Sequence, residues 1–474
     1  MLLDFAVRRH VFCNLTRVVL VLGFAYSAVA GNQQVQFPQA VIVEKVVCAT
    51  NPEQSYALFL PPGYTPEKKW PILYAFDPLG RGSVPVKLFQ DAAKEFGFIV
   101  VGSNNSRNGI ELNDIVETLW SDTHQRFTLD ERRVYTTGFS GGARVASAVA
   151  LSYRGAVSGV IAASGGPPLS FNTSLAKRLS FFGTAGTDDF NFPEMQRLKR
   201  RMDEVGVTNR LAIFEGAHEW PPPDTCSEAI GWMEIQAMKS GTRARDDELI
   251  DKRLAVKIRT AREYENSKKP YEAYLEYEAL VSEFSGLRDM NEFAAVAERL
   301  KISKEVKAAI KSERTEEDDQ AVLSEKLHTL IAGLQDVESY PETMAQLKSE
   351  LSDLTRKSEG SKSTAEGRVA RRVLQAQLIQ IYEQAFALKQ KKNYAAIPAK
   401  FELAVLIKPK DPRVFYELAA AYARVGNKSQ ATKALGQAIE RGFSDVARIE
   451  QNEDFAILRN EADYKKLVSG LKKS

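Results

Sequence analysis

This sequence of 474 residues contains few cysteines and histidines, and its net charge is small. Its three cysteines are too few for a disulfide-dense scaffold or a multi-cysteine zinc module, and no motif predicts a cofactor or a metal ion. Its 64 Lys and Arg and 61 Asp and Glu leave a net charge of only +3, which argues against nucleic acid as a partner. Hydrophobic residues at 44% and charged residues at 26% are typical of folded proteins, and the length predicts two or three domains.

Long apolar runs are also missing, because the run over 18–26 is well short of the roughly 20 residues that span a bilayer. Arginines precede this run and Ala28-Val29-Ala30 follows it, which is the order of a secretory signal peptide. We therefore expect residues 1–30 to be removed by cleavage before Gly31, leaving a mature chain without a membrane span. That chain would be secreted or periplasmic, in the bacterial cell envelope. A retained N-terminal anchor is the alternative.

Cleavage would also remove one of the few cysteines, Cys13, and leave Cys48 and Cys226. An oxidising compartment permits a disulfide between these two, provided that their Cα atoms lie close enough. Free cysteine packs as a small hydrophobic residue, so two separate buried thiols are the favoured alternative.

Glycine and proline become rarer beyond residue 243, where the sequence changes character. Over 40–240, short β-rich runs alternate with amphipathic helical stretches, which predicts an α/β fold with a doubly wound, mostly parallel sheet and an antiparallel start. Beyond 243, helical periodicity predicts an all-α region. Two polar stretches, 312–320 and 356–367, are predicted to be flexible links. The chain is therefore expected to have five parts. These are a signal peptide (1–30), an α/β domain (31–240), a helical region with a partial repeat (241–355), a flexible link (356–367) and a repeat domain with capping helices (368–474).

Small and large apolar residues recur in the last part of the chain with a spacing of 34 residues. The matching positions are Ala385, Asn393, Phe401 and Ala404 against Ala419, Asn427, Leu435 and Ala438. A partial copy earlier in the chain has Ala261, Tyr264, Ala273, Tyr277 and Leu280. The pattern resembles tetratricopeptide repeats, well over 381–442 and fairly over 255–285. The resemblance implies helical hairpins that bind a protein or peptide partner, and a plain helical bundle is the alternative.

The chemistry is concentrated in the α/β part, where Gly138-Phe139-Ser140-Gly141-Gly142 has the pattern G-x-S-x-G. It follows a predicted strand over 133–137 and opens a predicted helix over 143–153, which is the context of a nucleophile elbow. In so tight a turn a Cβ on either flanking glycine would clash, and the Ser140 hydroxyl stands at a helix N-terminus that favours an oxyanion. We predict Ser140 as a nucleophile. A glycine-rich turn with a capping serine is the alternative.

A nucleophilic serine needs a base and the base needs an orienting acid, in the chain order Ser, Asp or Glu, His. Asp188 and Asp189 follow a predicted strand that ends at Gly183, and the spacing Gly186-x-x-Asp189 favours Asp189 as the acid. The base is predicted to be His218, because it alone of the four histidines follows Ser140 on a loop after a strand.

An oxyanion hole requires two N–H donors, and the backbone is their expected source. Gly141, directly after the nucleophile, is one predicted donor. The other is expected on the loop after the strand that ends at Phe76, where Pro78 has no N–H and Leu79 is the predicted donor by position. Arg81 can contact an anionic substrate or be a solvated loop arginine, and both alternatives stay open. Four further polar residues can be substrate contacts or turn formers, namely Asn104, Asn105, Ser106 and Arg107.

Residues 40–240 therefore resemble the α/β-hydrolase family, and within it secreted bacterial esterases related to feruloyl esterases, polyhydroxybutyrate depolymerases and dienelactone hydrolases. The segments that carry the resemblance are Arg133–Tyr135, Gly138–Arg144 and Gly216–Trp220. It implies hydrolysis of a small-molecule or polymer-linked ester through an acyl-enzyme, without a cofactor. Because only Ser164–Arg178 separates two predicted strands, we expect an open pocket without a large cap. A serine peptidase on the same fold and an inactive binding scaffold are the alternatives.

Overall fold

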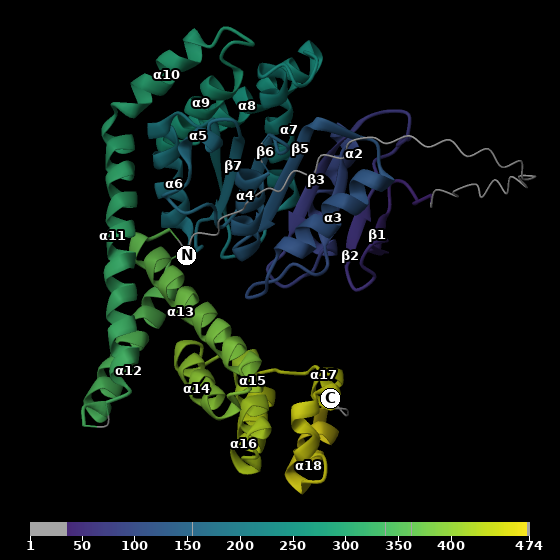
Figure 1. The fold of residues 1–474 in the computed structure, drawn as a ribbon. Helices are drawn as coiled ribbons and strands as arrows, with labels where there is room; N and C mark the ends of the chain where they lie inside the picture. The colour runs from purple at the N-terminus through teal and green to yellow at the C-terminus, as the bar shows by residue number, and fades with distance from the viewer. Residues whose placement is uncertain (1–35, 154, 337, 362, 472–474) are drawn as a thin grey trace, which may run out of the picture. The chain divides into compact units, whose positions relative to one another are not determined.

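The computed structural model describes residues 36–153, 155–336, 338–361 and 363–471. The predicted signal peptide over 1–30 and the cleavage site before Gly31 lie outside these residues. From Phe37 onward the chain forms one compact unit. Within it an eight-stranded sheet with its helices comes first, and a long series of helices follows (Figure 1).

The sheet has the strand order β1-β2-β4-β3-β5-β6-β7-β8. β2 is antiparallel to both of its neighbours, and every other pairing is parallel. This arrangement is that of an α/β-hydrolase fold, and it confirms the predicted doubly wound class and its antiparallel start. The strands are β1 (Ile42–Val47), β2 (Ser55–Phe59), β3 (Trp70–Phe76), β4 (Ile99–Ser103), β5 (Leu129–Phe139), β6 (Gly159–Ala163), β7 (Ser180–Gly186) and β8 (Asn209–Phe214).

Helices cover both faces of the sheet (Figure 1). Side chains alternate along the strands, so that Leu58 and Tyr74 belong to the core on one face, and Phe59 and Leu73 to the core on the other. The first core includes residues of α3 (Asn113–Arg126), α4 (Gly141–Ser152), α5 (Thr173–Ala176) and α6 (Phe192–Val205), and the second includes residues of α1 (Ser83–Leu88), α2 (Gln90–Phe96) and α7 (Pro223–Lys239). The carboxyl ends of the parallel strands share one edge, where their loops meet.

Cys48 and Cys226 are both buried and free, as favoured over a disulfide. Cys48 lies in the core on one face of the sheet and Cys226 in the core on the other face, so the sheet itself separates them. Burial raises the pKa of both thiols, that of Cys48 to about 11. Both are therefore protonated and unreactive at neutral pH.

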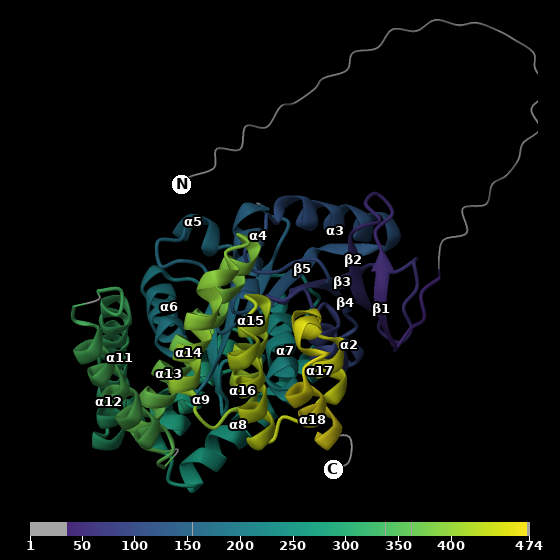
Figure 2. The ribbon, with the colours of Figure 1, turned by 90° about the horizontal axis from the view of Figure 1, so that it is seen from below.

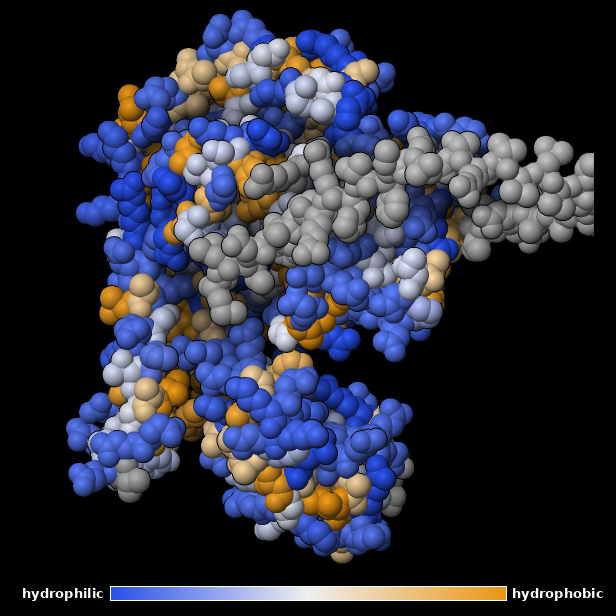
Figure 3. Space-filling model, in the orientation of Figure 1, coloured by the Kyte–Doolittle hydropathy of each residue, from blue (hydrophilic) through white to orange (hydrophobic). Residues whose placement is uncertain are grey.

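The region beyond 243 is helical, as the sequence predicts. Its helices are α8 (Asp247–Asn266), α9 (Pro270–Phe284), α10 (Asn291–Lys301), α11 (Lys304–Gly333), α12 (Tyr340–Ser358), α13 (Ala365–Gln390), α14 (Ile397–Ile407), α15 (Pro412–Arg424), α16 (Lys428–Glu440), α17 (Val446–Gln451) and α18 (Ala462–Leu471). On the face drawn in Figure 3, hydrophilic residues dominate and apolar residues form small, separate patches. In the described part of the chain, no helix combines the length and the apolar character needed to cross a membrane.

The acidic run over 312–320 lies inside α11, so its prediction as a flexible link was wrong. Two of its carboxylates, those of Glu316 and Glu317, pair with arginines of other helices, whereas Asp318 and Asp319 are exposed. Glu317 accepts hydrogen bonds from Arg197 at 2.7 Å and from Arg200 at 2.8 Å, both on α6. Glu316 pairs with Arg368 of α13. The other predicted link, 356–367, spans the end of α12 and the start of α13, and its flexibility stays a prediction.

Helix α7 shares a small core with the helices that follow it. This cluster consists of Ile235, Met238, Ile250, Leu280, Phe284 and Met290. Beside it the buried Arg210 of β8 pairs with Glu228 of α7 at 2.5 Å, and with Glu276 and Glu283 of α9 at 3.4 and 3.6 Å. The predicted boundary between 240 and 241 thus falls between elements that pack together, and it stays a prediction.

The apolar positions of the repeat pattern over 381–442 pack in one hydrophobic cluster, and those of the partial copy over 255–285 lie in two other clusters. Helix α13 packs on α14, α14 on α15, and α15 on α16 (Figure 2). The buried positions include Ala385, Phe401, Ala404, Phe415, Leu418, Ala419, Ala431, Leu435 and Ala438. Small alanines let neighbouring helices approach, and the large residues fill the space between them. Membership of the tetratricopeptide family stays a prediction.

Candidate active site

Ser140 occupies a tight turn between β5 and α4. Its φ is +53°, a conformation that is rare for a residue with a side chain and costs backbone strain. A Cβ on Gly138 would lie 2.1 Å from the carbonyl oxygen of Gly142, and a Cβ on Gly142 would lie 2.0 Å from that of Phe76. Both positions therefore require glycine, for the steric reason that the sequence pattern suggests.

The structure brings His218 and Asp189 to this serine. The Nε2 atom of His218 lies 2.9 Å from Ser140 Oγ, and its Nδ1 atom lies 2.8 Å from Asp189 Oδ1. An ionised Asp189 can only accept, so Nδ1 carries the proton and Nε2 is free to accept from the serine hydroxyl. The Asp189 carboxylate is fully buried, and the imidazole lies between the rings of Phe139 and Phe190, with centroid distances of 4.6 and 4.2 Å.

The two neighbouring acids have different partners. Asp189 Oδ1 also accepts the backbone N–H of Asn191 at 2.8 Å, which holds the carboxylate in place. Asp188 instead forms an ion pair with Arg371, its Oδ2 atom 2.8 Å from Nε. Of the two acids, only Asp189 hydrogen-bonds to the imidazole, and it is the acid that the glycine spacing favours; its role as the triad acid stays a prediction.

The histidine loop is tied to the loop after β3. Trp220 Nε1 donates to Asp77 Oδ2 at 3.0 Å, and the Trp220 ring centroid lies 5.8 Å from that of Phe139. The fully buried Asp77 carboxylate also binds the Arg81 guanidinium with two hydrogen bonds of 2.9 Å. Arg81 is thus a partner of Asp77, although about half of its side chain stays exposed.

The two predicted oxyanion donors differ in the structure. Gly141 is the first residue of α4, directly after Ser140, where backbone N–H groups lack helical partners. Leu79 already donates its N–H to Asp77 Oδ1 at 2.9 Å, so the prediction of Leu79 as the second donor is not supported. The cause is the aspartate two residues earlier, which forms a local turn that sequence position alone does not reveal.

Asn108 is a polar residue at this turn that the sequence analysis missed. A Cβ on Gly141 would lie 1.9 Å from Asn108 Oδ1 and 2.9 Å from its Nδ2, so this amide rests directly on the first residue of α4. Asn108 is exposed, and within the described residues its side chain has no hydrogen-bond partner. It stands one position beyond the polar run over 104–107, which was the available signal.

The run over 104–107 itself mostly anchors the loop to β2 and the turn before it. Asn105 Oδ1 accepts the Ser55 N–H at 2.9 Å, and its Nδ2 donates to the Glu53 carbonyl at 3.1 Å. Asn104 Nδ2 lies 3.2 Å from Ser55 Oγ. Ser106 is buried. These contacts favour turn formation over contact with a substrate.

Three residues of α13 also reach the catalytic loops, and no motif in the sequence points to them. Arg371 pairs with Asp188, and Arg372 donates to the Thr187 carbonyl. The Gln375 amide, oriented so that its donor and acceptor match their neighbours, bonds to the backbone of Asp188 and His218. Their distance in sequence explains why they were missed, since Thr187 and Arg372 are 185 residues apart.

Comparisons with known proteins found matches among solved structures. No protein-family model matches the chain, and no curated protein matches it. Among solved structures, a ferulic acid esterase matches at 16% identity and a TM-score of 0.35, over 41% of this chain and 96% of its own. An S-formylglutathione hydrolase from Staphylococcus aureus matches at 14% identity and a TM-score of 0.34, over 41% of this chain and 98% of its own. Dipeptidyl peptidase 4 from Porphyromonas gingivalis matches at 13% identity and a TM-score of 0.32, over 40% of this chain and 34% of its own.

Proposed function

We propose that this protein is a serine hydrolase that cleaves carboxylic esters through an acyl-enzyme, with Ser140, His218 and Asp189 as its triad. The observation that carries the proposal is the continuous hydrogen-bond chain from Ser140 Oγ through both ring nitrogens of His218 to Asp189 Oδ1, with steps of 2.9 and 2.8 Å. Serine, base and buried acid in this order are what activation of a hydroxyl requires.

In the first half-reaction, His218 Nε2 takes the hydroxyl proton while Ser140 Oγ attacks the acyl carbonyl carbon. Asp189 stabilises the imidazolium that forms, and it stays ionised. As the tetrahedral intermediate collapses, the imidazolium gives its proton to the departing alkoxide, so an alcohol leaves and the acyl-enzyme remains. Water then repeats the steps with His218 as base, releasing the acid and restoring Ser140.

The oxyanion of each tetrahedral intermediate needs N–H donors that are already in place. We assign the backbone N–H of Gly141 as one donor and the side-chain amide of Asn108 as the second. Asn108 is preferred to Leu79 because its amide adjoins Gly141 and has no other partner among the described residues, whereas the Leu79 N–H is engaged by Asp77.

The substrate proposed is a small-molecule or polymer-linked ester that reaches Ser140 from solvent. The segment between β6 and β7 contains only the four-residue helix α5 and turns, which is too little chain for a large cap. The signal-like N-terminus supports a secreted or periplasmic location, and the helical hairpins support a protein or peptide partner. Sequencing the mature N-terminus tests the location, with a start near Gly31 expected.

Labelling with a fluorophosphonate probe tests the activity. Wild-type protein should form a covalent adduct on Ser140 Oγ, and Ser140→Ala should not react. Folded wild-type protein that takes no label would leave an inactive binding scaffold as the better interpretation. If labelling succeeds, a panel of acyl esters against peptide amides decides between an esterase and a serine peptidase, since the triad serves both reactions.

A further inference from the structure

Helix α13 connects the catalytic loops with the helical hairpins. Residues in its first half contact the loop between β7 and α6, which carries Asp189. In its second half, Ile381 and Ala385 are buried with Phe401 and Ala404 of α14. One continuous helix of 26 residues therefore belongs to both packing regions.

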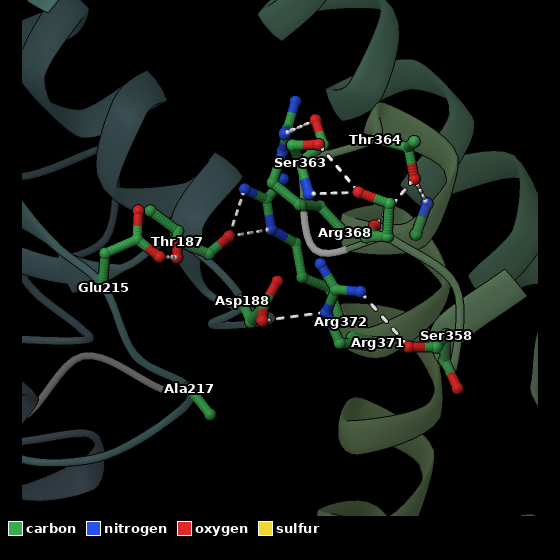
Figure 4. Close-up of polar contacts among 12 residues, drawn as sticks. Thr187, Asp188, Glu215, Ala217, Ser358, Ser363, Thr364, Arg368, Arg371 and Arg372 are labelled. Carbon is green, nitrogen blue, oxygen red and sulfur yellow. Dashed lines mark hydrogen bonds and ion pairs between the residues drawn. The ribbon is translucent and has the colours of Figure 1, made fainter.

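Figure 4 shows the contacts of Arg371 and Arg372 of α13 with Asp188 and Thr187 on the loop that carries Asp189. Arg372 donates to the Thr187 carbonyl from Nε at 2.8 Å and from Nη2 at 2.5 Å. Arg371 Nε lies 2.8 Å from Asp188 Oδ2. The Gln375 amide, oriented to suit its neighbours, donates to the Asp188 carbonyl at 3.2 Å and accepts the His218 backbone N–H at 3.1 Å. Gln375 thus links the acid loop and the base loop through one side chain.

Helix α11 holds the same loop from a second direction. Gln320 Nε2 donates to the Phe190 carbonyl at 2.7 Å. The carbonyls of Thr187, Asp188 and Phe190, which flank Asp189 on both sides, therefore all accept hydrogen bonds from the helical region. The remaining carbonyl, that of Asp189, accepts within its own loop from the N–H of Phe192.

Arg372 is the most deeply buried of these side chains, with 2% of it exposed. A buried guanidinium is costly unless its charge and donors find partners. Here Glu316 Oε2 lies 3.3 Å from Nη1, and the ring centroid of Phe192 lies 4.2 Å from the guanidinium carbon. Glu316 lies on α11, and Phe192 is the first residue of α6. The positive charge of Arg372 therefore has its partners only when α11 and α13 pack against the loop that carries Asp189.

We propose that Arg371, Arg372 and Gln375 are positioning residues of the triad, so that the helical region completes the catalytic site. This inference rests on the proposed hydrolase activity. A triad works only when its hydrogen bonds keep their geometry, and a displacement of about 1 Å can lower a rate about 100-fold. Because the helical contacts hold the backbone on both sides of Asp189 and at His218, losing them lets the acid and the base move relative to Ser140.

The test uses the full-length chain and Gln375→Met, which keeps the length of the side chain and removes both hydrogen bonds. We expect kcat for an activated ester to fall about 10-fold with KM within twofold, because the reacting groups are displaced and the substrate surface is not. The rate of fluorophosphonate labelling should fall by a similar factor. The matched control is Gln380→Met on the same helix, where Gln380 lines a pocket with His328 and Lys400 instead. It should leave both rates unchanged.

Substitutions of Arg372 test the same proposal independently. Arg372→Met should lower kcat by more than Gln375→Met does, and Arg372→Lys, which keeps a charged donor, should restore part of the loss. If Arg372→Met does not fold, Gln375→Met and Arg371→Gln decide the question, since both side chains are only partly buried. Unchanged kcat in folded Gln375→Met and Arg371→Gln, with an active wild type, would overturn this inference alone. A wild type that takes no fluorophosphonate label would instead overturn the hydrolase proposal.

Discussion

The neighbouring aspartates Asp188 and Asp189 allow a sharp test of the proposed triad. Asp189→Asn keeps the size of the side chain, but its amide N–H can donate a hydrogen bond to His218 Nδ1. The imidazole would then hold the other tautomer, with its remaining proton on Nε2, where it can no longer accept from Ser140. Asp188→Asn makes the same chemical change one residue earlier, at a carboxylate that faces Arg371.

The structure sets very different magnitudes for the two changes. Asp189 is fully buried with its oxygen 2.8 Å from His218, so the wrong tautomer should lower kcat about 10⁴-fold. That factor corresponds to about 5.5 kcal/mol of transition-state stabilisation. The Asp188–Arg371 pair has side chains 22% and 18% exposed and contributes about 1 kcal/mol to stability. Even if all of this were lost in the transition state, kcat would fall only about fivefold.

Steady-state hydrolysis of a p-nitrophenyl ester measures both variants, with urea unfolding to show that each is folded. The expected ratio of the two effects is about 10³. Equal losses of kcat, or a larger loss in Asp188→Asn, would refute the assignment of Asp189 as the acid. A small loss in both folded variants would refute a triad mechanism altogether.

Three further predictions follow from other parts of the structure. Asn108→Ala should lower kcat about 10²-fold with little change in KM, as expected for an oxyanion donor, and an unchanged kcat would exclude that role. Arg210→Met should lower the free energy of unfolding by about 3–5 kcal/mol in urea titrations, because it leaves the carboxylates of Glu228, Glu276 and Glu283 with only the two cations Lys257 and Arg253. Arg132→Met, at an exposed side chain, should change it by less than about 0.5 kcal/mol. Burial alone would raise the pKa of Glu228, but Arg210 and Lys257 hold it at about 2, below its ordinary 4.5. Its stabilising contribution is therefore complete above pH 4.5 and lost as the pH falls toward 2, so the urea midpoint should drop between pH 5 and pH 3 more in wild type than in Glu228→Gln.

The sequence predicted best those features that depend on interactions between residues close together in the chain. The turn around Ser140 could be predicted because glycine spacing, the strand before it and the helix after it lie within about twenty residues of chain. The order of acid and base followed from the same fold. The Gly186 spacing also favoured Asp189, since a short loop leaves few positions for a carboxylate to reach His218.

Where the sequence analysis failed, the deciding contact was hidden in a turn or distant in sequence. Leu79 was placed by its position, but Asp77 binds its N–H within the same turn. The acidic run over 312–320 looked like a solvated link, and only packing shows that its Glu316 and Glu317 pair with Arg197, Arg200 and Arg368. Charge alone cannot distinguish an exposed run from a paired one, because the partners stand on other helices.

By itself the sequence determined the α/β class, the nucleophile turn and the helical character of the second half, because local periodicity and backbone sterics encode each of them. Only the tertiary structure decided which acid meets the imidazole, which amide adjoins Gly141, and how the helical region meets the catalytic loops. Thr187 and Arg372 are 185 residues apart, and no local sequence pattern predicts that the Arg372 side chain donates to the Thr187 carbonyl. Side-chain hydrogen bonds between distant segments depend on the relative placement of whole elements, which the packing of their apolar faces determines.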